Sequence, residues 1–558
     1  GVYFLHAAAY VTDNIAVYTF VYEDGSRHQV PIRNNIEVFN FWGTGSSDVC
    51  KTAWNGSNAS STSVSIYFYA MENPYPEKTI SRLELSTTGK DAFCMVAAAT
   101  LTDKGPYMMD ELDRGNPDTA TWYPYEMPTH ETIVGTVLDC SWLLDAPAGK
   151  HGRLRTDGSR LFFEDGTEAN FWGTNISEGV FASHDRLDKI INRMAACGFN
   201  LVRIHNYMIS SAGPRALYAS PKMGKEFNPQ RVDQLCYAIS KFKEKGIYIF
   251  LDLHTARNKF EDDNIRGARD ASISQTDIKN SYWFDSELQR IDETFVRELL
   301  DTYNPYTGMR LADDPAIVFS DQNNETAFYG LTRSGGKYYD EDIRKLYCAW
   351  LREKYGSDEA LRKAWQYLGK EGLLEGESLE DYSVAFGYQG EREKYVKPRH
   401  DDNLHFIADT MSTYYENQKK LTDELGYGAL ITSTQNWGGP GPAMLYTLID
   451  CDFIDSHAYW SHPDQNFMMQ KGTAMGGNMP ISMLEDKSLG IIGQFFNDTV
   501  YDMPHTLTEW DECDLNPTMA EQFTLMAAYS SLHNWVPMNF AFSSQGDEAT
   551  EILQSTGP

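Results

Sequence analysis

An apolar run leads directly into a carboxylate in the stretch Ala316-Ile-Val-Phe-Ser-Asp-Gln-Asn-Asn-Glu325-Thr326. The run is short and rich in β-branched and aromatic residues, which is typical of a buried strand with a polar end. The stretch Pro504-His-Thr-Leu-Thr-Glu509-Trp510 has the same design. In a parallel α/β barrel the carboxyl ends of the strands form the face on which active sites are built, so we expect both glutamates on that face.

The region around these stretches alternates between strand-like and helix-like segments. The predicted strands are 169–174, 200–204, 247–253, 316–320, 429–433, 453–456, 505–508 and 536–542. Helix-length segments separate them, among them 185–197, 229–245 and 284–300. Eight strands in this alternation predict an α/β fold, a (β/α)8 TIM barrel, over residues 151–558.

The connection between the fourth and fifth predicted strands is much longer than the others. It runs from about residue 326 to about residue 428 and contains the amphipathic segment 341–355. Connections of this length usually carry structure or function of their own. We therefore expect a helical insertion that stands over the carboxyl face as a lid or as a wall of the site.

The first hundred residues show a different pattern, in which short strands are separated by turns. Residues 16–22 and 28–32 flank the turn Glu23-Asp-Gly-Ser26 as a hairpin, and 64–69, 80–85 and 94–100 alternate likewise. The pattern predicts a small, jelly-roll-like β-sandwich over residues 1–104. Residues 105–150 are rich in Pro, Gly and Asp, which predicts a linker or a wrap between the two domains.

Composition and charge exclude several classes of partner. The 558 residues include 48 Lys and Arg against 79 Asp and Glu, which gives a net charge of −31. This charge repels polyanions and argues against nucleic acid and acidic membrane surfaces, whereas a neutral polymer is not repelled. The longest apolar runs fall far short of the roughly 20 residues that a membrane span requires. The sequence indicates no oligomeric state.

Cysteine spacing and the chain ends carry less information. The 8 cysteines are scattered singly, without CxxC or zinc-type spacing, which favours buried free thiols over a disulfide framework or a metal site. The chain starts without a basic, apolar signal segment, so export cannot be read from it. The sandwich opens abruptly at Gly1 and little follows the eighth strand, which is typical of a fragment or a processed form.

Polar and aromatic side chains recur where the predicted strands end. In strand order they are Trp172, Asn175, Arg203, His205, Asp252, His254, Asn324, Glu325, Gln435 to Trp437, His457, Tyr459 and Glu509. One histidine after a strand is usually structural, but groups at equivalent positions of several strands converge on one cavity. Two carboxylates in such a cavity suit hydrolysis of a glycosidic bond, in which one protonates the leaving oxygen and the other meets the developing positive charge.

Taken in order, these residues resemble the retaining glycoside hydrolases of clan A, and among them glycoside hydrolase family 5, the cellulase-like family. The resemblance covers about 163–544. The motifs that match are Arg203 in Leu-Val-Arg-Ile-His, His254 in Leu-Asp-Leu-His, the pair Asn324-Glu325, His457-Ala-Tyr459 and Glu509 in Leu-Thr-Glu-Trp. No single motif is long, and the ordered set carries the resemblance.

The resemblance implies an enzyme that cleaves β-glycosidic bonds in a neutral poly- or oligosaccharide by double displacement, without a cofactor or a metal. Glu509 would be the nucleophile, kept ionised by Arg203 and Tyr459. Glu325 would be the acid/base, with a pKa raised by burial and by the negative nucleophile. The other candidate substrate-binding residues are Asn324, for the sugar 2-hydroxyl, and His205, His254, His457, Trp172, Asn175, Trp437 and Trp460.

Two features extend or depart from the family pattern. The family usually has a tryptophan at the end of strand eight, whereas this chain has Phe540 and Phe542, so substrate specificity does not transfer. The first domain resembles galactose-binding-like sandwiches. We also expect Trp437 and Trp460 to line an aromatic pocket together with the insertion, although packing of the insertion onto the barrel would explain both indoles equally well.

Two other functions are compatible with parts of the sequence. A metal-dependent barrel hydrolase would use His205, Asp252, His254 and His457 as ligands, but the His-x-His expected on its first strand is missing. A non-catalytic carbohydrate-binding protein is the third reading. Such a protein has no reason to keep both carboxylates.

Overall fold

The structure is a computed structural model of two compact units, residues 1–126 and 127–558. It describes residues 1–10, 14–58, 61–87, 93–102, 133–208, 217–218, 226–254, 265–266, 275–436, 442–460, 483, 490–512 and 520–542. Most of the predicted linker, from 103 to 132, lies outside the described residues, as do Trp437 and Cys513.

The first unit consists of two antiparallel sheets. Its strands are β1 (Val2–Ala9), β2 (Asn14–Tyr22), β3 (Arg27–Arg33), β4 (Cys50–Asn58), β5 (Ser61–Met71), β6 (Ile80–Thr87) and β7 (Phe93–Leu101). One sheet has the order β4-β5-β1-β7 and the other β3-β2-β6. Inward-facing side chains such as Phe4, Tyr18 and Tyr67 form one buried core, so the predicted β-sandwich is confirmed. Its galactose-binding-like character stays a prediction.

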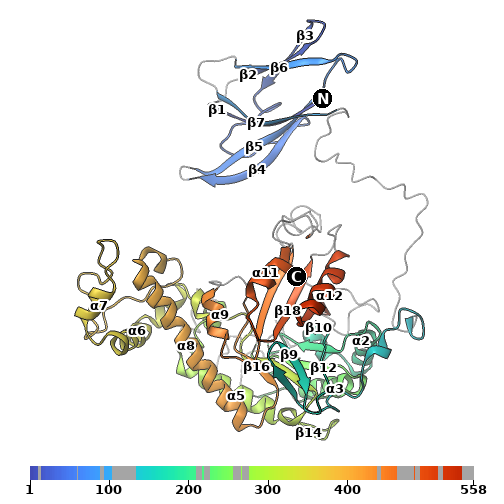
Figure 1. The fold of residues 1–558 in the computed structure, drawn as a ribbon, viewed down its shortest axis with the longest axis vertical. Helices are drawn as coiled ribbons and strands as arrows, with labels where there is room; N and C mark the ends of the chain where they lie inside the picture. Colours follow the sequence, from blue (N-terminus) through green and yellow to red (C-terminus); the bar gives the residue numbers. More distant parts are fainter. Residues whose placement is uncertain are drawn as a thin grey trace. The chain divides into compact units, whose positions relative to one another are not determined.

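The second unit is built on an eight-stranded parallel sheet (Figure 1). In chain order its strands are β10 (Gly173–Ile176), β11 (Leu201–Ile204), β12 (Tyr248–Leu251), β15 (Ile317–Asp321), β16 (Leu430–Thr432), β17 (Ile454–Trp460), β18 (His505–Glu512) and β19 (Trp535–Phe542). β19 pairs with both β10 and β18. A parallel bridge between Asn436 and Ser456 joins the ends of the sheet, so the predicted TIM barrel is confirmed.

Helices surround the sheet (Figure 1). The α-helices are α2 (His184–Ala196), α3 (Pro229–Lys245), α4 (Gln275–Lys279), α5 (Ser286–Asp301), α6 (Asp340–Tyr355), α7 (Asp358–Ala364), α8 (Lys397–Glu424), α9 (Pro442–Leu448), α11 (Gly490–Asp498) and α12 (Glu521–His533). Local signals account for several boundaries. Asn228 caps α3 with Pro229 at its first turn, and Gly246 ends that helix with a left-handed φ of 82°.

The barrel interior changes from apolar to charged along the strands. Side chains alternate between the two faces of a strand, so β11 points Leu201 and Arg203 inward and β12 points Tyr248 and Phe250 inward. Phe250, Phe319 and other rings fill the lower part of the barrel. Because the same alternation brings acidic residues inward where the strands end, the apolar layer forms the floor of a polar site.

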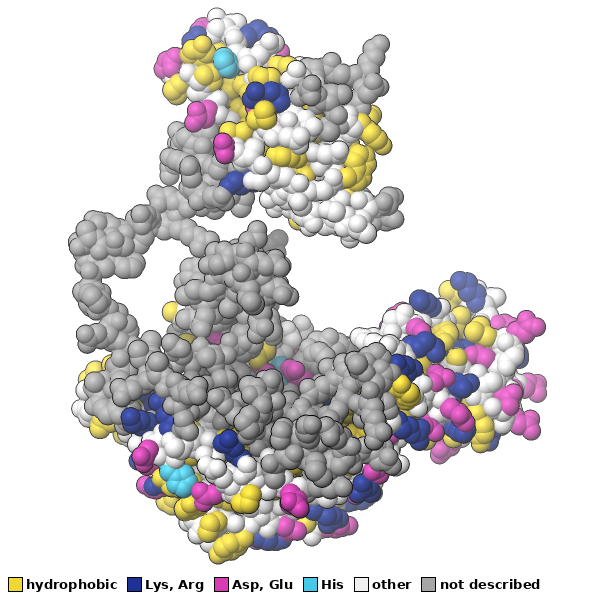
Figure 2. Space-filling model, turned by 180° about the vertical axis from the view of Figure 1, so that it is seen from behind, with side chains coloured by type: hydrophobic (Ala, Val, Ile, Leu, Met, Phe, Trp, Pro, Cys, Tyr) yellow, Lys and Arg dark blue, Asp and Glu magenta, His cyan; other side chains and the backbone are white. Residues whose placement is uncertain are grey.

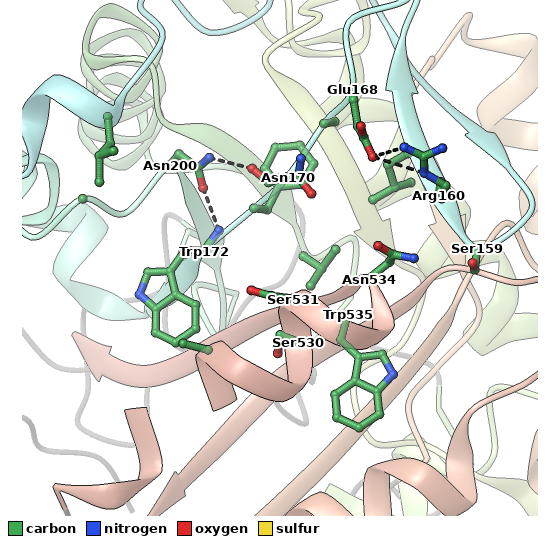
Figure 3. A pocket seen from close by; sticks show the side chains of 17 residues that line it. Ser159, Arg160, Glu168, Asn170, Trp172, Asn200, Ser530, Ser531, Asn534 and Trp535 are labelled. Carbon is green, nitrogen blue, oxygen red and sulfur yellow. Dashed lines mark hydrogen bonds and ion pairs between the residues drawn. The ribbon is translucent and has the colours of Figure 1, made fainter. Parts of the chain in front are cut away.

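The amino-terminal end of the barrel is covered by a hairpin and contains a hollow of about 340 Å³. The hairpin strands are β8 (Leu154–Asp157) and β9 (Arg160–Phe163), and Leu154, Leu161 and Phe163 belong to the barrel's lower core. Figure 3 shows the hollow between the starts of β10 and β11 and the helix α12. Asn200 accepts a hydrogen bond from the backbone of Trp172 and donates one to that of Asn170, which fixes the chain just before β10.

The connection between β15 and β16 forms the expected helices. Helix α8 connects α6 to the barrel. Near its start, Asp402 accepts hydrogen bonds from Lys354 and Tyr355 of α6. At its end, Glu424 pairs with Arg297 of α5. Figure 1 shows α6 and α7 to one side of the sheet, and Figure 2 shows acidic and basic side chains interspersed on their surface. A role of this insertion as a lid or wall stays a prediction.

Two further observations concern the chain as a whole. Among the described residues, no helix is both long enough and apolar enough to cross a bilayer. The cysteines that the structure describes are all free thiols; Cys50, Cys236, Cys348 and Cys451 are buried, whereas Cys197 is exposed.

Candidate active site

Arg203 is the centre of a buried polar network at the carboxyl face of the barrel. Its guanidinium group is fully buried and donates hydrogen bonds to Asp252 (2.8 Å), Glu509 (2.7 Å), Asn324 (2.7 Å) and Asp321 (3.0 Å). These acceptors come from the ends of three strands, β12, β15 and β18. A planar cation with five donors suits this task, because one side chain can hold several carboxylates and an amide in fixed positions.

Glu509, on β18, is held by donors at both carboxylate oxygens. Arg203 donates to Oε1, and the hydroxyl of Tyr459 donates to Oε2 at 2.6 Å. Burial alone would raise the pKa of Glu509, but the neighbouring His457, His205 and Arg203 hold it below its ordinary value. The carboxylate therefore stays ionised in an enclosed site, which is the state that a nucleophile requires.

Glu325 follows β15 and lies on the more open side of the site. Its side chain is 34% exposed, against 8% for that of Glu509. Its backbone has a left-handed φ of 47°, and its N–H donates to the side chain of Gln435 at 2.7 Å. This conformation is uncommon for a residue other than glycine and is retained where the surroundings enforce it. It turns the carboxylate towards His457, whose Nδ1 lies 2.8 Å from Oε1.

The pKa of Glu325 differs from the expectation stated from the sequence. Burial does raise it, but the hydrogen bond and the charge of His457 outweigh burial and lower the pKa of Glu325 to about 2. The pKa of His457 is raised in turn: burial lowers it, and the charges of Glu509 and Glu325 more than compensate. In the free protein the shared proton therefore rests on His457. The expectation from the sequence took account of burial and of Glu509, and it did not include the effect of His457 on the pKa of Glu325.

The two carboxylates lie close together. One carboxylate oxygen of Glu325, one of Glu509 and a ring nitrogen of His457 all lie within 4.8 Å of one another. Arg203 stands beneath them, and Nε2 of His205 lies 3.5 Å from Oε1 of Glu509. The site therefore contains a pair of carboxylates, of which Glu509 is well shielded from solvent and Glu325 is more accessible.

Comparison with known proteins connects this geometry to a family. Residues 163–298 match the family model described as Cellulase (glycosyl hydrolase family 5). The protein is a glycoside hydrolase. The matched range contains Arg203 and His254, and both glutamates lie outside it. The resemblance to family 5 inferred from the sequence is confirmed, and a search of curated proteins found no significant match.

Solved structures found similar to this glycoside hydrolase have low sequence identity. An endo-1,4-β-mannanase from Rhizomucor miehei is 11% identical, with 70% of this chain and 90% of that chain covered and a TM-score of 0.43. An endo-β-1,4-mannanase from Thermotoga petrophila is 17% identical, with 67% and 68% covered and a TM-score of 0.39. A β-galactosidase from the psychrophilic Marinomonas ef1 is 15% identical, with 66% and 53% covered and a TM-score of 0.43.

Most of the other predicted site residues lie around the same polar network. Asn175 is buried and donates to three backbone carbonyls of β18 and β19, which ties the first strand of the barrel to the seventh and eighth. His205 is held at Nδ1 by Asp252 at 2.6 Å. His254 is held at Nδ1 by Asp292 at 2.6 Å, and its Nε2 is buried without a hydrogen-bond partner in the described structure. Binding of a sugar hydroxyl at this ring nitrogen stays a prediction.

The three tryptophans are placed differently. β10 begins at Gly173, so Trp172 precedes the strand; its ring packs against Trp510 at 6.1 Å and lines the hollow of Figure 3. Trp460 is 5% exposed and belongs to an apolar cluster with Met483 and Ile491. These contacts are typical of packing residues, and a role of either indole in sugar binding stays a prediction. Trp437 lies outside the described residues, and its role stays a prediction.

Sequence reasoning missed Lys279, a half-buried side chain at the end of α4. The segment after it packs on the site: Asn280 accepts a hydrogen bond from the backbone of Ala327, and Tyr282 stacks edge-on to His254. Burial lowers the pKa of Lys279, while the charges of Glu325 and other acids of the site oppose the shift. A lone lysine in a long loop has no sequence signature that could have revealed it.

The metal-ligand set of the alternative function is not assembled. Among the described residues, the only group of three or more potential ligands is Glu325, His457 and Glu509, not the predicted set His205, Asp252, His254 and His457. Arg203 binds both Asp252 and Glu509 directly. Its permanent positive charge repels a second cation at these carboxylates.

Proposed function

We propose that the protein is a retaining glycoside hydrolase that cleaves β-glycosidic bonds in a neutral poly- or oligosaccharide. The observation that carries this proposal is the approach of the two carboxylates, whose oxygens lie within 4.8 Å. Retaining enzymes hold their two carboxyl groups about 5–5.5 Å apart, whereas inverting enzymes separate them by about 6.5–9.5 Å to admit a water molecule. The β configuration rests on the resemblance to family 5.

In the first step, an oxygen of Glu509 attacks the anomeric carbon while the glycosidic C–O bond breaks. The leaving oxygen takes a proton from Glu325, and the sugar becomes esterified to Glu509. Arg203 and Tyr459 fix the attacking carboxylate, and Asn324, anchored by Arg203, is placed to bind the sugar 2-hydroxyl. Because these donors are already in position, they need no reorganisation during the reaction.

In the second step, water replaces the departed group. Esterification removes the negative charge of Glu509, so Glu325 is left as a base that takes a proton from the water while its oxygen attacks the anomeric carbon. The ester bond to Glu509 breaks and both carboxyl groups return to their starting state. Two inversions at one carbon give net retention.

Retention is directly measurable. We expect proton NMR of a hydrolysing aryl β-glycoside to show the β-anomer of the sugar first, followed by slow mutarotation to the α-anomer. A panel of aryl gluco-, manno- and galactosides with soluble β-glucans, β-mannans and galactans would supply the substrate. Initial appearance of the α-anomer would contradict the double-displacement mechanism. Loss of activity with a chelator would instead favour the metal-dependent alternative.

The acid/base role of Glu325 predicts a dependence on the leaving group. Glu325→Ala should lower kcat/KM by roughly 10²- to 10⁴-fold for substrates with poorly acidic leaving groups. Dinitrophenyl glycosides, whose leaving group departs without a proton, should still form the glycosyl-enzyme at nearly the wild-type rate. Measurement of the pre-steady-state burst on both substrate types tests this. An equal loss on both would show that Glu325 does not act as the acid.

A further inference from the structure

The hydrogen bonds around His457 continue away from the catalytic pair to a buried acid. Nε2 of His457 lies 2.7 Å from the hydroxyl oxygen of Thr508. That hydroxyl lies 2.7 Å from Oδ2 of Asp455, and the backbone N–H of Thr508 donates to Oδ1 of the same carboxylate at 3.1 Å. Asp455 and Thr508 are fully buried on the neighbouring strands β17 and β18. The chain Asp455–Thr508–His457–Glu325 is called the relay below.

The direction of each hydrogen bond in the relay follows from the groups it joins. An ionised carboxylate only accepts, so Thr508 must donate its single hydroxyl proton to Asp455. The hydroxyl oxygen of Thr508 is then available only as an acceptor, and Nε2 of His457 must carry a proton and donate to it. With Nε2 committed, Nδ1 of His457 is the only ring atom that can exchange a proton with Glu325.

We propose that Asp455 and Thr508 are positioning residues that fix the tautomer of His457, so that Glu325 and His457 together hold one transferable proton. This inference rests on the proposed function of Glu325 as the acid/base. In the free enzyme the proton rests on Nδ1 of His457. When a sugar fills the site, the proton passes from Nδ1 to Oε1 of Glu325 and on to the leaving oxygen, which leaves a neutral imidazole protonated at Nε2. Water restores the proton in the second step.

The relay explains how a carboxyl group with a low pKa can act as an acid. The charged pair of Glu325 and His457 is stable while solvent reaches it, because the side chain of Glu325 is 34% exposed. A bound sugar excludes that water, and lower polarity favours the neutral arrangement with the proton on Glu325. If the relay were absent, His457 could bind its proton at Nδ1 with a bare Nε2, and it would have no proton-accepting atom facing Glu325.

The closest test of the relay removes one hydroxyl group. Thr508→Val keeps the shape of the side chain, and Asp455→Asn keeps the shape of the carboxylate but can donate a hydrogen bond to Thr508, which reverses the relay. Both variants should lower kcat/KM by roughly 10- to 100-fold on poorly acidic leaving groups and by less than about 3-fold on dinitrophenyl glycosides. Thr508→Ser, which retains the hydroxyl, should recover most of the activity.

The matched control is Thr174→Val. Thr174 is also a fully buried strand threonine, and its hydroxyl donates to a backbone carbonyl at 3.2 Å on β19. A loss that merely reflects a missing buried hydroxyl would affect Thr174→Val equally and would be the same on both substrate types. Melting temperatures of all variants identify any that fail to fold, in which case Thr508→Ser against wild type still reports on the geometry of the hydroxyl.

The pH profile provides a second readout. Burial raises the pKa of Asp455 to about 6, while His457 and Arg203 and the hydroxyls of Thr508 and Thr506 oppose the shift. Because Oδ1 of Asp455 accepts the backbone N–H of Thr508, protonation takes place at Oδ2, which then donates to the Thr508 hydroxyl instead of accepting from it. We therefore expect kcat/KM on poor leaving groups to fall as the pH drops through about 6. In Asp455→Asn this decrease of kcat/KM at low pH should be absent. In the wild type it should be absent when the substrate is a dinitrophenyl glycoside.

The outcomes separate the two proposals. If Glu325→Ala shows the leaving-group dependence but Thr508→Val and Asp455→Asn behave like Thr174→Val, the relay is refuted and the proposed function stands. If Glu325→Ala itself shows no such dependence, the assignment of the acid/base fails. The relay is supported if the loss of kcat/KM depends on the leaving group in Glu325→Ala, Thr508→Val and Asp455→Asn. Thr508→Ser must in addition recover most of the activity.

Discussion

Glu509→Ala is expected to lower kcat by roughly 10⁴- to 10⁶-fold, because the variant has no carboxylate to attack the anomeric carbon. The vacated space lies beside Arg203 and Tyr459, which remain as donors for a small anion. Added azide should enter this space, attack the anomeric carbon and restore turnover of a dinitrophenyl β-glycoside. The product of one displacement is an α-glycosyl azide, identifiable by NMR.

Glu325→Ala is the matched control for the azide experiment. Both variants lose one carboxylate from the same site, but on opposite sides of the sugar. In Glu325→Ala the intact Glu509 still forms the glycosyl-enzyme, and azide then attacks it in place of water to give the β-glycosyl azide. The assignment of the two roles would be reversed if Glu509→Ala gave the β-azide and Glu325→Ala the α-azide.

Much of the barrel could be predicted because its strands are apolar runs with polar ends. The third and fourth strands were placed within about three residues of β12 and β15. The first strand was placed too early, because Ala169 and Phe171 look like strand residues but pack into the floor of the barrel before β10 begins. Because the first strand was predicted too early, Trp172 was assigned to the end of a strand, whereas it precedes β10. In the sandwich, β1 and β4 were missed; β4 is largely polar, so it shows no hydrophobic alternation.

The paired carboxylates Glu325 and Glu509 could be located from the sequence because each follows an apolar strand, and barrel closure brings the strand ends together. Their protonation states could not be predicted from the sequence, because they depend on neighbouring side chains from other strands. His457 was expected to bind substrate, whereas its ring lies between Glu325 and Thr508. Asp455 is indistinguishable in sequence from any other aspartate in an apolar run. The pairing of β17 with β18 brings it beside Thr508, whose hydroxyl donates to Oδ2 of Asp455 at 2.7 Å.

Arg203→Met is expected to lower the free energy of unfolding of the barrel by about 3–5 kcal/mol, the cost of leaving buried charges without their partner. Asp252, Asp321 and Glu509 would lose the cation that pairs with all three of them. Each is buried in the same low-polarity region, and their mutual repulsion would be opposed much less. Arg203→Lys should recover part of the loss, because it restores the charge but not the four-way hydrogen bonding.

The loss should also depend on pH. Burial and the charge of Asp252 raise the pKa of Asp321 to about 8 although Arg203 opposes the shift. A carboxyl group whose folded pKa is raised binds more protons in the folded state, so its contribution to stability falls as the pH rises between its unfolded pKa, near 3.8, and about 8. Removing Arg203 takes away a charge that opposes the raised pKa of Asp321 and that helps to hold the pKa of Glu509 below its ordinary value, so both pKa values rise. The difference in melting temperature between Arg203→Met and wild type should therefore be larger at pH 8 than at pH 5.

A surface variant provides the control for this experiment. Arg290 is exposed and pairs with Glu287 on α5, so Arg290→Met should leave the melting temperature nearly unchanged at both pH values. Thermal unfolding should be followed by tryptophan fluorescence and circular dichroism, since two units can unfold separately. Equal melting temperatures of Arg203→Met and wild type at pH 8 would mean that the three acids move apart or bind protons without any loss of stability. The network around Arg203 would then be held by packing rather than by its charge.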